Sequence, residues 1–145
     1  MQGVVFTLSL LTFFLIYNLS SSIASAADAS GNIGGNIMCN GSTDRQNSTL
    51  ALSAFMGDVP VYGNWEITSY DSGGNTISVT GYLNTGNIGK DSFDLEGMVT
   101  SDSICGMQVP SEISLTGLCG SSGSVRIASN SALEGDFLGD IQCTP

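Results

Sequence analysis

One short pattern, repeated four times, constrains the fold of this chain more than any other feature of its sequence. Its copies are ISVTGYL (residues 77–83), FDLEGMV (93–99), ISLTGLC (113–119) and the shortened LEGDF (133–137). Each copy alternates apolar and mostly polar residues with a period of two, which is typical of a β-strand with one buried face. The repeats therefore predict four half-buried strands.

Each copy also carries a glycine on the apolar face of its strand: Gly81, Gly97, Gly117 and Gly135. A glycine inside a strand costs about 0.5–1 kcal/mol relative to alanine, so four in register need a physical reason. Either the strands bend sharply there, as a closing barrel requires, or a bulky group packs against the bare backbone. That group would be a core aromatic such as Trp65, or a ligand. The bend or the aromatic is the favoured interpretation.

Further alternating segments extend the predicted sheet. They are residues 48–55, a strand that opens at Gly63-Asn64-Trp65, and residues 124–128. Short links rich in turn residues separate the segments, and no helical period occurs. Seven or eight such strands predict an all-β domain, a single antiparallel meander that closes or nearly closes into a barrel, because closure removes exposed strand edges. A β-sandwich is the alternative.

The first 26 residues predict a signal peptide. Val4–Tyr17 is an almost unbroken apolar run, too short to span a bilayer comfortably, and Ala24-Ser25-Ala26 has the small-x-small form of a cleavage site. We expect cleavage after Ala26 and export to the outside or the cell surface. Because no Lys or Arg precedes the apolar run, an uncleaved anchor is the alternative.

The remaining chain is expected to form one domain. Residues 27–38 are small and polar and predict a flexible lead-in, within which Ile33 and Ile37 could begin a short edge strand. Residues 39–145 predict a disulfide-bonded β domain, which is long enough for a modest core.

The charge of the chain restricts its partners. Thirteen acidic and three basic residues give a net charge of −10, which repels nucleic acid and poorly matches anionic lipid. We therefore expect no nucleic acid, and no membrane after signal cleavage. An unknown small molecule or a cationic or protein partner is expected instead, with calcium as a further alternative. Asp71, Gly73 and Asn75 resemble part of a calcium loop, but a hairpin turn is favoured because the later ligands are absent.

Four cysteines in a short exported chain predict two disulfides. Strand direction reverses at each link of a meander, which places Cys39 and Cys105 at one end and Cys119 and Cys143 at the other. Bridged Cα atoms lie about 4.4–6.8 Å apart, whereas the two ends of a strand of about seven residues are about 20 Å apart. The Cys39–Cys105 and Cys119–Cys143 pairs are therefore favoured.

Two glycosylation sequons follow the first cysteine. They begin at Asn40 and Asn47, and have meaning only if the host glycosylates exported asparagines. The alternative is that both are ordinary turn residues.

No catalytic constellation is predicted. The chain has no histidine, which excludes Ser-His and Cys-His arrangements, and its cysteines are expected to be oxidised. Lys90 next to Ser92 could in principle form a Ser-Lys dyad, but neighbours at that spacing on a strand entrance are common by accident. A glycosidase-type carboxylate pair would have to come from residues that alternation places on solvated outer faces, namely Asp94, Glu96, Glu134 and Asp136. We expect no enzyme activity, no cofactor and no metal site.

One stretch of the chain is similar to a known architecture. Gly63-Asn64-Trp65 opening a strand, then a hairpin, then Thr80-Gly81-Tyr82, resembles the opening of the avidin and lipocalin up-and-down barrels. In those families a tryptophan near a strand start closes one end of a barrel around a small-molecule cavity. The resemblance covers residues 63–83. It implies the barrel architecture, and no ligand-binding residue is carried over from it.

The predicted function is an exported, acidic, disulfide-stabilised β-barrel module that binds a partner or serves structurally. The alternatives are an inhibitor or cell-envelope interaction protein that acts through its loops, and thirdly an exported hydrolase. The longer links, residues 56–63, 84–91 and 120–123, gather at one end of a meander, and functional contacts usually sit on longer loops.

From this loop-rich end we predict four ligand or partner contacts. They are Tyr62, Trp65, Asn84 and Lys90, the last of which is the only lysine in the chain.

Overall fold

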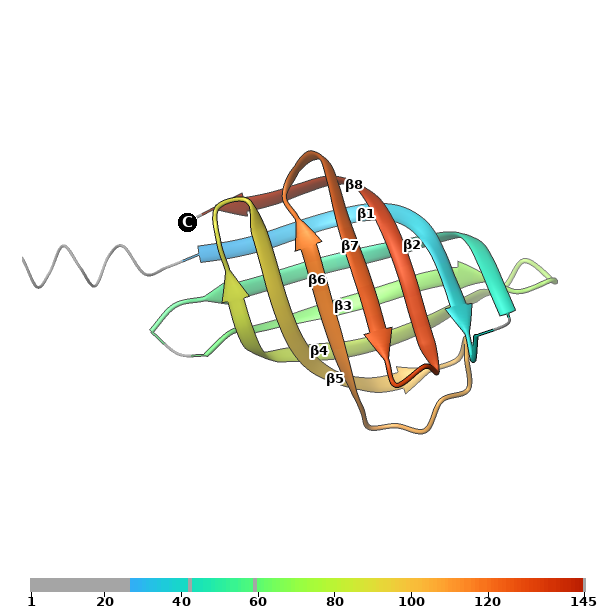
Figure 1. Ribbon diagram of the computed structural model, residues 1–145. Helices are drawn as coiled ribbons and strands as arrows, with labels where there is room; N and C mark the ends of the chain where they lie inside the picture. The colour runs from blue at the N-terminus through green and yellow to red at the C-terminus, as the bar shows by residue number, and fades with distance from the viewer. Residues whose placement is uncertain (1–26, 42, 59, 145) are drawn as a thin grey trace, which may run out of the picture.

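The computed structural model describes residues 27–41, 43–58 and 60–144, which form a closed antiparallel barrel of eight strands (Figure 1). Each strand pairs with the next in chain order, and β8 pairs back with β1. The strands are β1 (Ala27–Cys39), β2 (Thr43–Met56), β3 (Tyr62–Tyr70), β4 (Thr76–Ile88), β5 (Ser92–Asp102), β6 (Ser111–Leu118), β7 (Gly120–Ser129) and β8 (Leu133–Thr144). The predicted all-β meander and its closure into a barrel are confirmed. The predicted signal peptide lies outside the described residues.

The prediction of a flexible lead-in over residues 27–38 is wrong, because this segment is strand β1 and pairs with both β2 and β8. Glycine hides its alternation. The buried side chains Ala29, Ile33 and Ile37 are four residues apart, and Gly31 and Gly35 occupy the inward positions between them. A Cβ at Gly35 would clash with the backbone of β8, so glycine here lets the two strands meet. The barrel domain therefore begins with β1.

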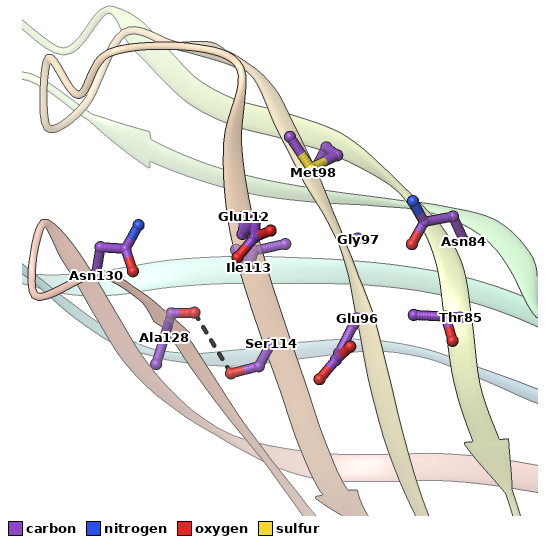
Figure 2. A pocket seen from close by; sticks show the side chains of 10 residues that line it. All are labelled: Asn84, Thr85, Glu96, Gly97, Met98, Glu112, Ile113, Ser114, Ala128 and Asn130. Atoms are coloured by element: carbon purple, nitrogen blue, oxygen red, sulfur yellow. Dashed lines mark hydrogen bonds between the residues drawn. The ribbon is translucent and has the colours of Figure 1, made fainter.

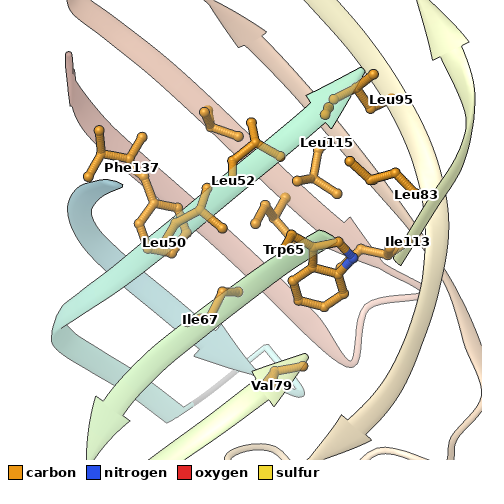
Figure 3. Close-up of a cluster of buried hydrophobic side chains, with 14 of the residues drawn as sticks. Leu50, Leu52, Trp65, Ile67, Val79, Leu83, Leu95, Ile113, Leu115 and Phe137 are labelled. Atoms are coloured by element: carbon orange, nitrogen blue, oxygen red, sulfur yellow. The ribbon is translucent and has the colours of Figure 1, made fainter. Parts of the chain in front are cut away.

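The apolar face of each repeated segment lines the interior of the barrel. Val79, Leu95, Leu115 and Leu133 are fully buried, as the alternation predicted. Figure 3 shows how side chains from many strands meet there around Trp65. The hydrophobic core of the molecule is thus the filled interior of the barrel.

The glycines in these segments are explained by close packing. A Cβ at Gly81 would clash with the carbonyl oxygen of Met98 and would lie 2.7 Å from Cζ2 of Trp65. A Cβ at Gly117 would clash with the ring of Phe93. Close approach of neighbouring strands and contact with a core aromatic therefore both contribute, as expected for a tightly curved sheet.

Two links predicted as longer loops are mostly strand. β4 continues to Ile88, so only residues 89–91 connect it to β5. The continuation is possible because the β4–β5 register shifts between Leu83 and Thr85, which accommodates Asn84 as a bulge. Likewise β7 begins at Gly120, and its pairing with β8 shifts before Gly123. Two of the three links at the end of the barrel expected to carry long loops are therefore short.

One disulfide lies at each end of the barrel. Cys39, at the end of β1, is bonded to Cys105 in the β5–β6 link, with their Cα atoms 5.2 Å apart. Cys119, between β6 and β7, is bonded to Cys143 on β8, with their Cα atoms 5.8 Å apart. These are the pairs favoured by the alternation of strand direction. Two such bridges are consistent with an extracellular protein.

Candidate functional site

The outer wall of the barrel carries two surfaces of different chemistry, with β1 between them on one side. We call the first the neutral face; it comprises the outward side chains of β2 from Asn47 onward, of β3 and of β4. These segments contain a single charged residue, Glu66. Their outward residues are otherwise small, hydroxyl, amide or aromatic. Among the aromatics, Phe55, Tyr62 and Tyr82 are 42%, 54% and 43% exposed.

The second surface, the charged face, comprises the outward side chains of β5 to β8. Its exposed charged residues are Asp94, Glu96, Glu112, Arg126, Glu134, Asp136 and Asp140. A glycosidase pair would have to come from four of these carboxylates, and all four point to solvent: Asp94, Glu96, Glu134 and Asp136. Two exposed leucines, Leu118 and Leu138, lie on the same face.

One transverse line of outward residues crosses four neighbouring strands at the end of the barrel where β1 begins and β8 ends. Thr144 on β8 pairs with Asp28 on β1, Asp28 with Phe55 on β2, and Phe55 with Tyr62 on β3. We call these four residues the aromatic row. The rings of Phe55 and Tyr62 are stacked, with centroids 5.4 Å apart and planes inclined by 24°. The Thr144 hydroxyl donates a hydrogen bond to Oδ1 of Asp28.

A surface hollow of about 300 Å³ lies along the aromatic row. It is lined by all four residues of the row and by Ala27, Met56 and Gly57. One wall is therefore aromatic, whereas the Asp28 carboxylate and the Thr144 hydroxyl supply polar atoms on the other side.

A second line, the polar row, lies beside the aromatic row, two residues further along each strand. Gln142 pairs with Ser30, Ser30 with Ser53, Ser53 with Asn64, and Asn64 with Tyr82. All five residues are exposed. Two residues along a strand correspond to about 7 Å, so the two rows form one continuous surface.

The structure separates the four predicted contact residues. Tyr62 belongs to the aromatic row, and Lys90 lies exposed in the short β4–β5 link. Trp65 points into the barrel and is only 2% exposed, so it does not share the outer surface with Tyr62 and Lys90, and its contact with a ligand stays a prediction. Asn84 borders a different hollow, of about 410 Å³, together with Glu96 and Glu112 (Figure 2).

Trp65 is a core residue with one unsatisfied polar atom. Its ring packs over Gly81, and Figure 3 draws it among the buried apolar side chains of the interior. Among the described residues, the buried Nε1 has no hydrogen-bond partner. Such a buried donor costs about 1–3 kcal/mol, which packing of the large ring must offset.

The two sequon asparagines both adopt backbone conformations that asparagine tolerates. Asn40 has φ of 52° in the β1–β2 turn, and Asn47 has φ of 61° where the β1–β2 register shifts. Both side chains are exposed. The alternative of ordinary turn residues thus has a structural reason, because Asn is enriched in the left-handed region. Glycosylation of either residue stays a prediction.

The Asp71–Asn75 segment is a hairpin turn organised by its first carboxylate. Oδ1 of Asp71 accepts hydrogen bonds from the backbone N–H groups of Gly73 and Asn75, each at 2.9 Å. The Asn75 side-chain amide donates to Oδ2 at 3.2 Å. These bonds, first of all that from the Asn75 backbone, hold the pKa of Asp71 below its ordinary value. The carboxylate thus serves the turn.

Two further observations concern the described part of the chain as a whole. Over residues 27–41, 43–58 and 60–144, no three or more His, Cys, Asp or Glu side chains are grouped so that they could hold a metal ion. Within the same residues, no helix has the length and apolar character needed to cross a membrane.

Sequence reasoning missed three of the four residues in the aromatic row. Asp28 lies in the segment predicted as a lead-in, and Thr144 lies beyond the last predicted strand. Phe55 lies at the end of a predicted strand, but the sequence does not indicate which residues of the neighbouring strands lie beside it. The usable signal was the apolar spacing of β1, which would have added a strand between β2 and β8.

No protein-family model, curated protein or solved structure matches the chain.

Proposed function

We propose that this chain is an exported binding module that meets its partner on the neutral face of the barrel. The observation that carries the proposal is the gathering of exposed aromatic side chains on a surface with a single charge. The interior, by contrast, is occupied by the apolar core. Exposed aromatic groups in one region are a common mark of an interaction site.

The alternatives have less support. An inhibitor that acts through its loops would need extended links. At the end of the barrel where the aromatic row lies, only residues 89–91 connect β4 to β5 and only Cys119 connects β6 to β7. A hydrolase would need an acid and a base held together in one site. The outward carboxylates of the charged face are instead solvent-exposed side chains. Binding without catalysis is therefore the function we assign.

The test measures binding of the purified, fluorescently labelled protein to cell envelopes of its host. We expect saturable binding that is strongly reduced by Tyr62→Ser combined with Tyr82→Ser on the neutral face. The matched control, Glu96→Gln combined with Glu134→Gln on the charged face, should bind like the unaltered protein. Binding that is non-saturable, or that is lost only in the control, would contradict the proposal.

Native mass spectrometry of protein recovered from the host tests the interior independently. We expect the mass of the polypeptide with its two disulfides and no retained small molecule. A co-purifying small molecule that persists in both pairs of surface variants would place the binding site inside the barrel and overturn the proposal.

A further inference from the structure

The aromatic row and the polar row together present two kinds of contact side by side. The aromatic row supplies stacked rings on β2 and β3, next to a carboxylate and a hydroxyl on β1 and β8. The polar row supplies hydroxyl and amide groups on the same strands. The aromatic row crosses three inter-strand spacings of about 4.8 Å, so it extends for about 14 Å.

The charges around these rows restrict the ligand. The only charged residue in the two rows is Asp28, and none of the three cationic residues of the chain lines the hollow beside it. A phosphate, sulfate or uronate group would therefore meet a carboxylate with no cation to balance it. The net charge of −10 adds a repulsive field for any polyanion. These charges exclude an anionic ligand. The hydroxyl and amide groups that make up most of the polar row favour an uncharged ligand over a cation.

An uncharged ligand that uses both rows must combine apolar faces with many hydroxyl groups. A pyranose ring has this character, because its C–H groups form an apolar face that packs on an aromatic ring while its hydroxyls point outward around the rim. The Asp28 carboxylate can accept hydrogen bonds from such hydroxyls, and Ser30, Ser53, Asn64 and Gln142 can donate or accept others. A protein partner of standard size would bury about 800 Å² of mostly larger side chains, whereas serine dominates the centre of this surface.

We infer that the aromatic row and the polar row form a binding site for a neutral polysaccharide, with the Phe55–Tyr62 stack as its platform. The inference rests on the proposed binding function and names the chemical class of its ligand. The site occupies the neutral face on β2 to β4 and extends across β1 to the last outward residues of β8, Gln142 and Thr144. Chain direction follows from the geometry: the polymer runs around the barrel, across β8, β1, β2 and β3, and not along any one strand.

The experiment is affinity electrophoresis of the purified protein in gels that contain a neutral β-glucan, a mannan or soluble chitin oligomers, with alginate as the anionic comparison. We expect retardation by at least one neutral glycan and none by alginate. Phe55→Ala combined with Tyr62→Ala should weaken binding by about tenfold or more, which corresponds to the loss of about 1.4 kcal/mol. Asp28→Asn, which preserves shape, should weaken it to a smaller extent.

The matched control is Leu118→Ala combined with Leu138→Ala, which removes a similar exposed apolar pair from the charged face. This variant should be retarded like the unaltered protein. The two disulfides, mapped by mass spectrometry without reduction, and an unchanged thermal midpoint verify that each variant is folded. If the double aromatic variant does not fold, Asp28→Asn alone decides the matter, and full retention of its binding overturns the inference.

Other outcomes separate this inference from the proposed function. If no neutral glycan retards the protein but Phe55→Ala with Tyr62→Ala abolishes binding to cell envelopes, the partner is of another class, such as a protein. The polysaccharide inference is then wrong and the proposed function stands. If the protein binds neither glycans nor envelopes, both are wrong. Equal retardation by alginate also overturns the inference, because the surface would then not select an uncharged ligand.

Discussion

The neutral face and the charged face cover the same core but have nothing else in common. Inward residues of β3 and β4, such as Ile67 and Val79, are as fully buried as Leu115 and Ile127 on β6 and β7. Outward, the first pair of strands carries one charged residue, whereas the charged face is lined with carboxylates. Folding dictates the inner set, because the side chains that fill the barrel are nearly all apolar, with Ser48, Ser69 and Ser129 as the buried polar residues. The outer sets are free to differ, and their difference is therefore the better guide to function.

The largest expected effects test whether the charged face depends on its own disulfide. Cys119–Cys143 closes 24 residues within that face, whereas Cys39–Cys105 closes 66 residues and joins β1 to the β5–β6 link. Replacing Cys119 and Cys143 by serine should lower the free energy of unfolding by about 3.5 kcal/mol, and replacing Cys39 and Cys105 should lower it by about 4 kcal/mol. The second value is larger because a disulfide that closes a longer loop removes more entropy from the unfolded chain.

Urea unfolding of the two double variants measures both values. A greater loss for the Cys119/Cys143 variant would show that the bridge mainly secures the short β6–β7 pairing. Loop closure would then be the minor contribution.

The next prediction concerns the line where the two faces meet, between β4 and β5. Gly81→Ala should destabilise the protein by about 3 kcal/mol, because its Cβ would clash with the Met98 carbonyl oxygen and crowd Trp65. Gly34→Ala, on β1, is the matched control; the nearest atom to its Cβ would be 3.8 Å away. Thermal unfolding should show the control unchanged. Equal loss in both variants would mean that strand glycines matter through the unfolded chain and not through packing.

A third comparison separates carboxylates that serve the fold from those that only face solvent. Asp102 accepts hydrogen bonds from the backbone N–H groups of Ile104, Cys105 and Met107, at 2.8–2.9 Å. Asp102→Ala should therefore cost about 2 kcal/mol in unfolding free energy. Asp94→Ala, on the charged face, should change it by less than about 0.5 kcal/mol. A large loss for Asp94 would reveal a structural role for the charged face.

The smallest expected effect is a pH dependence at the β3–β4 turn. The folded pKa of Asp71 is lowered, so the unfolded state binds its proton more tightly. The stabilisation is present above the ordinary value of 3.8 and is lost as the pH falls through the lowered folded pKa. Urea unfolding across this range should show a smaller decline with falling pH for Asp71→Asn than for the unaltered protein. Identical slopes would mean that the turn bonds do not persist in solution.

Much of the fold can be predicted from the alternation of apolar and polar residues, because this pattern is local to each strand and shows which side chains point inward. It predicted the burial of Leu95 and Leu133, and the reversal of strand direction predicted both disulfide pairs. It failed for β1, where Gly31 and Gly35 replace the apolar residues that would have shown the period. The inward parity of Trp65 places it in the core, apart from the exposed Tyr62 and Lys90.

The candidate site could not be predicted in the same way. The aromatic row exists only because of cross-strand register, which brings together residues from the first and the last strand of the barrel, Asp28 and Thr144. Register depends on bulges such as the shift between Gly35 and Ile37 in the β1–β2 pair, and no local pattern indicates where those occur.

The pairing of β1 with β8 has a consequence for biosynthesis. Of the eight described strands, β1 leaves the ribosome first, and it acquires its second neighbour only when β8 has emerged. Until then β1 presents an unpaired edge, which is a template for aggregation. Closure between such distant segments is also slow, because the chain must lose entropy before the contact forms. We therefore expect a chain truncated before β8 to need protection by a chaperone, and to lack the aromatic row however well its other strands pair.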